Sequence, residues 1–183
     1  MLGAADVPFE AMAAGVDEDS AKDALRADGI SPRNLADALA ELKAIKLSQR
    51  FPEALVLGCD QVASLDGAIY NKATSREEAR DHLRALRGET HQQISAAVIC
   101  EAGKPVWRHI DIAKLSMRDF SDAFLDSYLD EEWPAIGACA GGYRLEGRGA
   151  QLFSRIDGNY FTILGLPLLP LLEYLRVRGV MTE

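Results

Sequence analysis

The chain has 183 residues, of which 48% are hydrophobic and 26% are charged, and its formal net charge is −8 at pH 7. This composition predicts one globular domain over residues 1–183. The negative charge argues against broad electrostatic binding to nucleic acid or to an anionic membrane. A few lysines or a divalent cation can nevertheless make a local site for a small anion.

The cysteines and the apolar runs exclude further classes of protein. Cys59, Cys100 and Cys139 are far apart and show no Cys-x-x-Cys spacing, so neither a disulfide framework nor a zinc site is expected. This usage favours a reducing cytoplasm. No stretch reaches the ~20 apolar residues of a membrane span, and no signal peptide is visible.

The first fifty residues predict a helix end, an extended segment, an acidic loop and a long helix. Residues 2–5 are typical of a frayed helix end, and residues 7–12 of a short strand with Pro8 at its start or edge. The acidic run at 16–19 predicts a solvated turn and a helix cap. Ser31 and Pro32 are typical of a helix start, and apolar residues at helical spacing continue that helix to about residue 49.

An apolar run at residues 55–62 predicts a buried strand whose end carries Asp60. Ligand sites in open α/β sheets lie beyond the carboxyl ends of strands, so Asp60 is a candidate for chemistry. A carboxylate that only caps a turn is the alternative. Asp66 and Gly67 then predict a hairpin between residues 62–63 and 69–70, with Lys72 shortly after it.

The rest of the chain alternates helices, strands and turns. We expect helices after Ser75 and over 119–129, and a last one from Pro167 through Leu175. Strands are expected at 92–100, 106–115, 152–156 and 160–164. The glycine-rich segment 137–143 allows a backbone to approach a ligand, but it matches neither common phosphate-binding fingerprint. Together these elements predict an α/β fold with a mixed twisted sheet, antiparallel hairpins and flanking helices.

Six polar side chains are candidates for the chemistry of a phosphoanhydride. Cleaving that bond requires a base for water, positive charge on the phosphate oxygens, and carboxylates to hold Mg²⁺ or Mn²⁺. Asp60 and Glu18 are candidates for the metal or base roles, and Lys43 and Lys72 for the phosphates. Spacing alone does not bring these four residues together. The full set of candidates is Asp60, Lys43, Lys72, Glu18, Gln61 and Glu146.

A second hypothesis uses Cys59 as a nucleophile with His82, His91 or His109 as its base. Cys59 falls within the predicted strand, and none of the histidines has a diagnostic neighbourhood. A small buried cysteine is the commoner case.

Short motifs in a fixed order resemble the Maf proteins, which are nucleoside triphosphate pyrophosphatases once described as septum formation inhibitors. The motifs that carry this resemblance lie at residues 16–18, 42–44, 58–62, 65–67, 72, 86–91, 140–147, 156–160 and 165–168. Each motif is weak by itself, but the ordered set is specific. It implies a fold similar to that of inosine triphosphate pyrophosphatases, with a cleft between two lobes.

The resemblance also implies an activity and roles for residues. The family cleaves a nucleoside triphosphate to the monophosphate and pyrophosphate with a divalent metal, which suggests a cytoplasmic house-cleaning enzyme and a homodimer. Asp60 is then the proton acceptor, and Lys43, Lys72 and Glu18 line the phosphate and metal region. The resemblance implies that two further positions set which base the enzyme prefers, and that they favour 7-methyl-GTP over dTTP or UTP. These positions are Gln61 and Glu146. A nucleotide-binding regulator without turnover, linked to cell division arrest, is the alternative.

Three departures from the family pattern affect these expectations. Asn71 and Ala73 flank Lys72 where the family usually has Gly and Pro, and residues 93–96 replace a usual Tyr-Thr-Gly. The Ser-x-Ser-x-Arg-Arg phosphate loop that opens the family has no counterpart. We therefore expect that Met1 is an internal methionine and that a chain with the upstream segment releases pyrophosphate faster.

Overall fold

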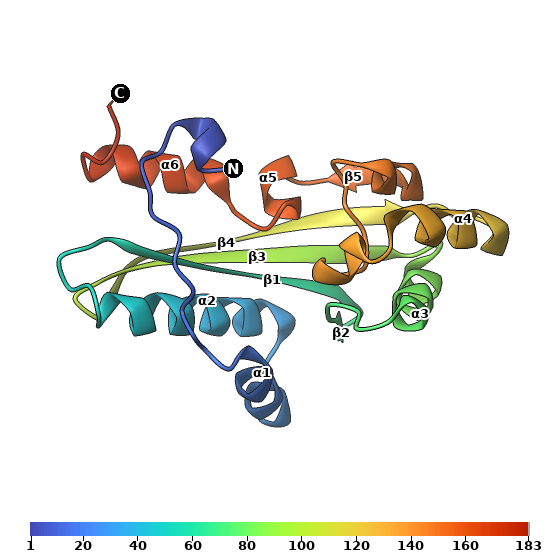
Figure 1. The fold of residues 1–183 in the computed structure, drawn as a ribbon, viewed down its shortest axis with the longest axis horizontal. Helices are drawn as coiled ribbons and strands as arrows, with labels where there is room; N and C mark the ends of the chain where they lie inside the picture. The colour runs from blue at the N-terminus through green and yellow to red at the C-terminus, as the bar shows by residue number, and fades with distance from the viewer. Residues whose placement is uncertain (183) are drawn as a thin grey trace. The chain divides into compact units, whose positions relative to one another are not determined.

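The structure, a computed structural model, describes residues 1–182 and confirms an α/β fold with antiparallel hairpins and flanking helices (Figure 1). Five strands form one sheet in the order β2-β1-β3-β4-β5. No helix within the described residues is long and apolar enough to cross a membrane. The strands are β1 (Val56–Leu65), β2 (Ala68–Tyr70), β3 (Thr90–Glu101), β4 (Lys104–Met117) and β5 (Phe153–Asp157). The α-helices are α1 (Glu18–Ala27), α2 (Pro32–Ser48), α3 (Arg76–Leu86), α4 (Asp122–Glu132), α5 (Tyr160–Ile163) and α6 (Leu168–Val177), and the 3-10 helices are η1 (Gly3–Ala5), η2 (Ala135–Ala138) and η3 (Arg148–Leu152).

The chain forms two compact units, each assembled from separate segments. The first unit takes residues 1–61, 95–111 and the chain from Gly165 onward. The second takes residues 62–94 and 112–164. The strands β1, β3 and β4 contribute residues to both units.

In the first unit, α2 and α6 lie on opposite faces of the strands (Figure 1). Ser31 caps α2 by accepting a hydrogen bond from the backbone N–H of Asn34 at 3.3 Å, as the sequence predicts. Tyr174 of α6 stacks on Trp107 of β4 with ring centroids 5.3 Å apart. On the other face, α2 buries a stripe of small and branched residues. This stripe is Leu35, Ala36, Leu39, Ala40, Ala44 and Leu47.

Gly58 of β1 lets α2 approach the strand closely. A Cβ at this position would clash with the backbone oxygen of Ala40 and lie 2.7 Å from the backbone nitrogen of Ala44. Because both are main-chain atoms, the helix as a whole has to move to make room. Glycine at position 58 therefore fixes the distance between α2 and β1.

Substituting Gly58→Ala is expected to destabilise the protein by about 1–3 kcal/mol, the usual range for overpacking a well-filled core. The free energy of unfolding in urea measures this. Gly3→Ala is the matched control, because its new Cβ would have only ordinary contact, 3.8 Å from Phe9. Equal stability of the two variants would contradict the packing argument.

In the second unit, arginines of α3 pair with aspartates of α4. Arg80 Nε donates to Asp126 Oδ1 at 2.7 Å, and Arg84 Nη2 donates to Asp122 Oδ2 at 2.5 Å. Arg87 also reaches Asp122, at 2.8 Å. These guanidinium groups lower the pKa of Asp122 and Asp126. The pairs therefore stabilise the helix contact at neutral pH, and this contribution is lost as pH falls through the lowered pKa values.

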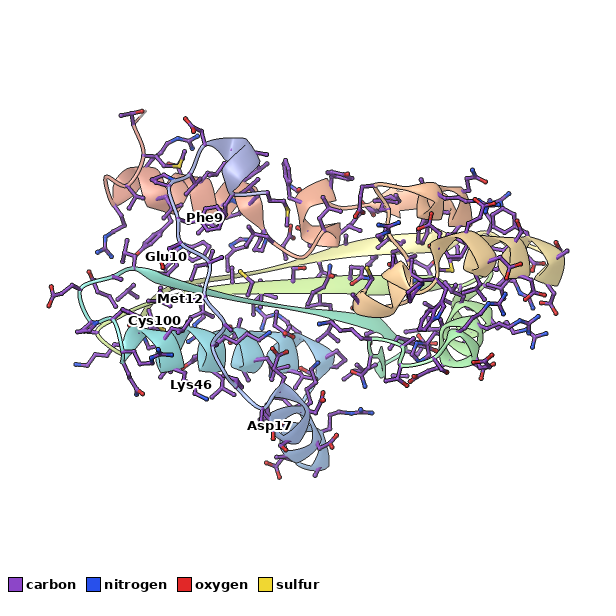
Figure 2. The ribbon with its side chains drawn as sticks, viewed as in Figure 1. Phe9, Glu10, Met12, Asp17, Lys46 and Cys100 are labelled. Carbon is purple, nitrogen blue, oxygen red and sulfur yellow. The ribbon has the colours of Figure 1, made fainter. Side chains whose placement is uncertain are left out.

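Residues 7–16 form an extended segment, not the predicted strand. Figure 2 shows Phe9, Glu10 and Met12 in succession along it, leading to Asp17 at the start of α1. Phe9 is 57% exposed, and residues 7–16 belong to no strand in the part of the chain that the structure describes. The prediction was wrong because a single run of apolar residues forms a strand only where a neighbour pairs with its backbone.

Two further predictions were wrong. The strand at 55–62 does not end at Asp60, which is the fifth residue of the ten-residue β1; the apolar run resumes at Val62 and continues the strand. Residues 160–163 form the short helix α5, because the side chain of Asn159 accepts a hydrogen bond from the backbone N–H of Phe161 and starts a helical turn. The hairpin around Asp66 and Gly67 is confirmed, with Leu65 opposite Ala68.

Candidate active site

Three elements of the first unit each contribute one charged side chain to a cluster. Glu18 lies in the first turn of α1, Lys43 on α2 and Asp60 on β1. The acidic run caps a helix, as the sequence predicts: Asp17 accepts from the backbone N–H of Ser20 at 3.1 Å, and the two acidic residues after it lie in the first turn of α1. The structure thus brings together three residues that sequence spacing alone could not connect.

Lys43 is the centre of this cluster. Its Nζ lies 2.8 Å from Asp60 Oδ1, 3.1 Å from Glu18 Oε2 and 3.3 Å from the backbone oxygen of Cys59. A lysine ammonium has three N–H donors and no acceptor. All three donors are therefore occupied by protein oxygens.

The burial of the cluster changes its protonation. Burial raises the pKa of Asp60, and the hydrogen bond and charge of Lys43, followed by the charge of Lys22, only partly offset this. For Lys43, burial alone would lower the pKa, but two carboxylates together raise it. The raised pKa values of Asp60 and Lys43 agree with the contacts, because Lys43 has two anionic neighbours and Asp60 has one cation within bonding distance. A buried carboxylate with a raised pKa is a better proton acceptor near neutral pH than an exposed one.

One oxygen of Asp60 has no partner. Its Oδ2 atom is buried and makes no hydrogen bond within the residues that the structure describes, and the residue is only 8% exposed. Leaving a buried carboxylate oxygen unbonded is costly, and a catalytic role or a bound water or ion is among the explanations for such an atom. Oδ2 can accept from a water molecule or coordinate a cation.

Of the remaining candidates, one is the neighbour of this cluster in the chain, and two belong to the second unit. Gln61 follows Asp60 on β1, and Gly165 packs near its side chain, since a Cβ there would lie 3.6 Å from Gln61 Oε1. Lys72 and Glu146 are exposed residues of the second unit. Both act electrostatically on the thiol of Cys139, whose pKa is raised first by burial and then by Glu146, while Lys72 lowers it. These two side chains therefore lie near the same cysteine.

Comparison with known proteins identifies the family. The family model described as Maf-like protein matches residues 1–178. The chain belongs to the Maf family. It is 51% identical over 179 residues to a protein of Roseobacter denitrificans, covering 98% of this chain and 90% of that protein. It is also 50% identical over 182 residues to a protein of Caulobacter vibrioides, covering 100% of this chain and 91% of that one. Both relatives bear the name nucleoside triphosphate pyrophosphatase.

Cysteine chemistry is not supported in this Maf protein. Burial raises the pKa of the Cys59 thiol to about 12, so the thiol is protonated at neutral pH. His91 pairs with Tyr143, and His109 stacks on Trp107. His82 lies edge-on to Tyr70. A protonated thiol without a histidine partner is not a nucleophile of the kind proposed from the sequence.

A buried polar network that we did not predict from the sequence holds the glycine-rich segment. Tyr143 Oη lies 2.6 Å from His91 Nε2 and accepts from Gln93 Nε2 at 2.8 Å. Gln93 Nε2 also donates to the backbone oxygen of Ala140 at 3.0 Å. Burial lowers the pKa of His91 to about 4, so the imidazole in this network is neutral at pH 7. Polar residues at the alternate positions His91 and Gln93, on one face of β3, were the sequence signal from which this network could have been predicted.

Tyr143→Phe is expected to lower the free energy of unfolding by about 1–3 kcal/mol, because it leaves buried His91 and Gln93 without their shared partner. Urea unfolding measures the loss. Tyr160→Phe removes the same atom from a side chain that is 47% exposed, and its effect should stay within about 0.5 kcal/mol. If both variants behave alike, the network contributes no stability.

Proposed function

We propose that this Maf protein hydrolyses nucleoside triphosphates to the monophosphate and pyrophosphate, using the cluster of Asp60, Lys43 and Glu18. At the level that its relatives share, it is a hydrolase of phosphoanhydride bonds. The observation that carries the proposal is the contact geometry: a buried carboxylate, oriented by Lys43, with one oxygen open for a ligand. Relatives that are 51% and 50% identical carry the same activity in their names.

In the proposed reaction, Asp60 acts on water. Lys43 holds Oδ1 at 2.8 Å and so fixes the direction of Oδ2, which accepts a proton from the attacking water. Water adds across the anhydride that joins the α- and β-phosphates, that bond breaks, and pyrophosphate leaves. The role of Lys43 is to position Asp60 and to keep it ionised, since its hydrogen bond and charge favour the carboxylate.

The carboxylates fit Mg²⁺ or Mn²⁺ as the metal. Mg²⁺ is commonly held by one or two protein carboxylates together with water and substrate phosphates. The carboxylates of Asp60 and Glu18 would supply one or two such ligands, with Asp60 Oδ2 left free for water, whereas residues 1–182 contain no group of three or more His, Cys, Asp and Glu side chains suited to a metal. When bound, the cation would neutralise charge on the phosphates. Substrate oxygens and water would complete its coordination.

We propose 7-methyl-GTP as the preferred substrate, with Gln61 and Glu146 as the residues that select the base. Glu146 is exposed on the loop before η3, and a carboxylate can accept hydrogen bonds from guanine N–H groups. Asp60 Oδ2 accepts no hydrogen bond from either side chain within the described residues, so the proposed proton acceptor is the same for every nucleotide. A dTTP or UTP preference is the competing assignment. Lys72 stays a candidate for binding phosphate.

The test is pyrophosphate release from 7-methyl-GTP, dTTP and UTP in the presence of Mg²⁺, Mn²⁺ or a chelator. We expect release with metal, none with chelator, and the highest kcat/KM for 7-methyl-GTP. Higher kcat/KM for dTTP and UTP would reassign the substrate. Nucleotide binding by calorimetry without any release would instead support a regulator that has lost turnover.

A further inference from the structure

One face of α1 turns toward the protein, and it carries a lysine that the reaction so far does not use. Lys22 is partly buried, as are Glu18, Ala21 and Leu25, whereas Asp19, Ser20, Asp23, Ala24 and Arg26 are exposed. The partly buried positions recur at the spacing of one helix face. Lys22 therefore lies on the same face as Glu18, one turn further along α1.

Lys22 is a partly buried cation of α1 without an ionic partner in the described part of the chain. Lys43 directs its three N–H donors to Asp60, Glu18 and the backbone oxygen of Cys59. Lys22, in contrast, makes no hydrogen bond or ion pair with any residue from 1 to 182. Its charge nevertheless acts on Asp60, after burial and Lys43 among the influences on that carboxylate. Lys22 thus lies one turn from Glu18 on the same face of α1, and its ammonium group has donors available for a ligand.

The charge balance of the cluster calls for such a group. Before a metal binds, Asp60, Glu18 and Lys43 together leave one net negative charge, so a triphosphate needs added positive charge here. Phosphoryl chemistry depends on positive groups near the phosphate oxygens. Lys22 brings the cluster to neutrality and offers N–H donors that Lys43 cannot offer while it holds both carboxylates.

We propose that Lys22 binds the triphosphate of the substrate as a second cationic residue of the site, an inference that rests on the proposed pyrophosphatase function. Lys43 then positions the carboxylates, and Lys22 contacts the phosphates. The recognised group is the triphosphate chain and not the base, so the contribution is the same for every nucleotide.

The experiment compares Lys22→Gln with Arg26→Gln, which removes a charge from the exposed side of the same helix. A charged hydrogen bond to phosphate predicts that Lys22→Gln lowers kcat/KM roughly 10- to 100-fold for 7-methyl-GTP, dTTP and UTP alike. Inhibition by inorganic tripolyphosphate should weaken by a similar factor. Lys22→Arg should recover part of the kcat/KM and part of the inhibition by tripolyphosphate. Arg26→Gln should have the same kcat/KM and inhibition as the unchanged protein.

The outcomes separate this inference from the proposed function. If Lys22→Gln keeps the kcat/KM and tripolyphosphate inhibition of the unchanged protein, Lys22 does not bind phosphate. A loss for one base only, with tripolyphosphate inhibition intact, would also overturn the inference. If the unchanged protein releases no pyrophosphate, the proposed function fails instead. Calorimetric titration of both glutamine variants with tripolyphosphate then still decides the role of Lys22.

Discussion

Asp60→Asn is expected to abolish pyrophosphate release, with a loss of about 10²–10⁴-fold or more, the range for removing a positioned general base. Asparagine keeps the shape of the side chain but cannot accept the proton of the attacking water. Lys43 retains Glu18 and the backbone oxygen of Cys59 as partners, so the fold should persist. Pyrophosphate release and thermal unfolding, measured on the same preparation, check both statements.

Asp66→Asn is the matched control for that substitution. Asp66 lies in the exposed turn between β1 and β2 at φ 50°, a conformation that asparagine adopts readily. This variant should keep full activity. If Asp60→Asn is as active as Asp66→Asn, then Asp60 is not the proton acceptor.

Lys43→Met is expected to destabilise the protein and to slow the reaction. The side chains of Lys43 and Asp60 are 19% and 7% exposed, and removing one partner of a buried pair costs about 3 kcal/mol or more at neutral pH. Without Lys43 the pKa of Asp60 rises further. A folded-state pKa above the unfolded value makes stability fall as pH rises, so the destabilisation should be smaller in acid.

The same rise in pKa affects catalysis. Activity requires ionised Asp60, so the acid limb of the pH profile of kcat/KM should move to higher pH in Lys43→Met. Lys43→Arg, which keeps the charge, should shift it less. Lys46→Met is the control, because Lys46 is exposed and hydrogen-bonds only to the backbone oxygen of Gly15 within the described residues. An unshifted acid limb in Lys43→Met would show that Lys43 does not tune Asp60.

Local signals in the sequence predicted much of the fold. Helix caps such as Ser31 and Ser75 act on N–H groups three residues away, and the Asp66–Gly67 turn joins strands that are adjacent in the chain. Such interactions depend on neighbours in sequence. The predictions failed where the deciding group was a pairing partner or a competing cap, as at residues 7–12 and at Asn159.

By itself, the sequence determined that this is an α/β protein of the Maf type and which acids and lysines are candidates for its chemistry. Only the tertiary structure decided which of them touch. Lys43 and Asp60 are 17 residues apart in the chain, and they meet because Gly58 lets α2 pack closely on β1. The structure also distinguished the two lysines: Lys43 has all its donors bound to protein oxygens, while Lys22 has none bound within residues 1–182. Contacts of this kind arise from packing between distant segments, which residue types and local spacing do not specify.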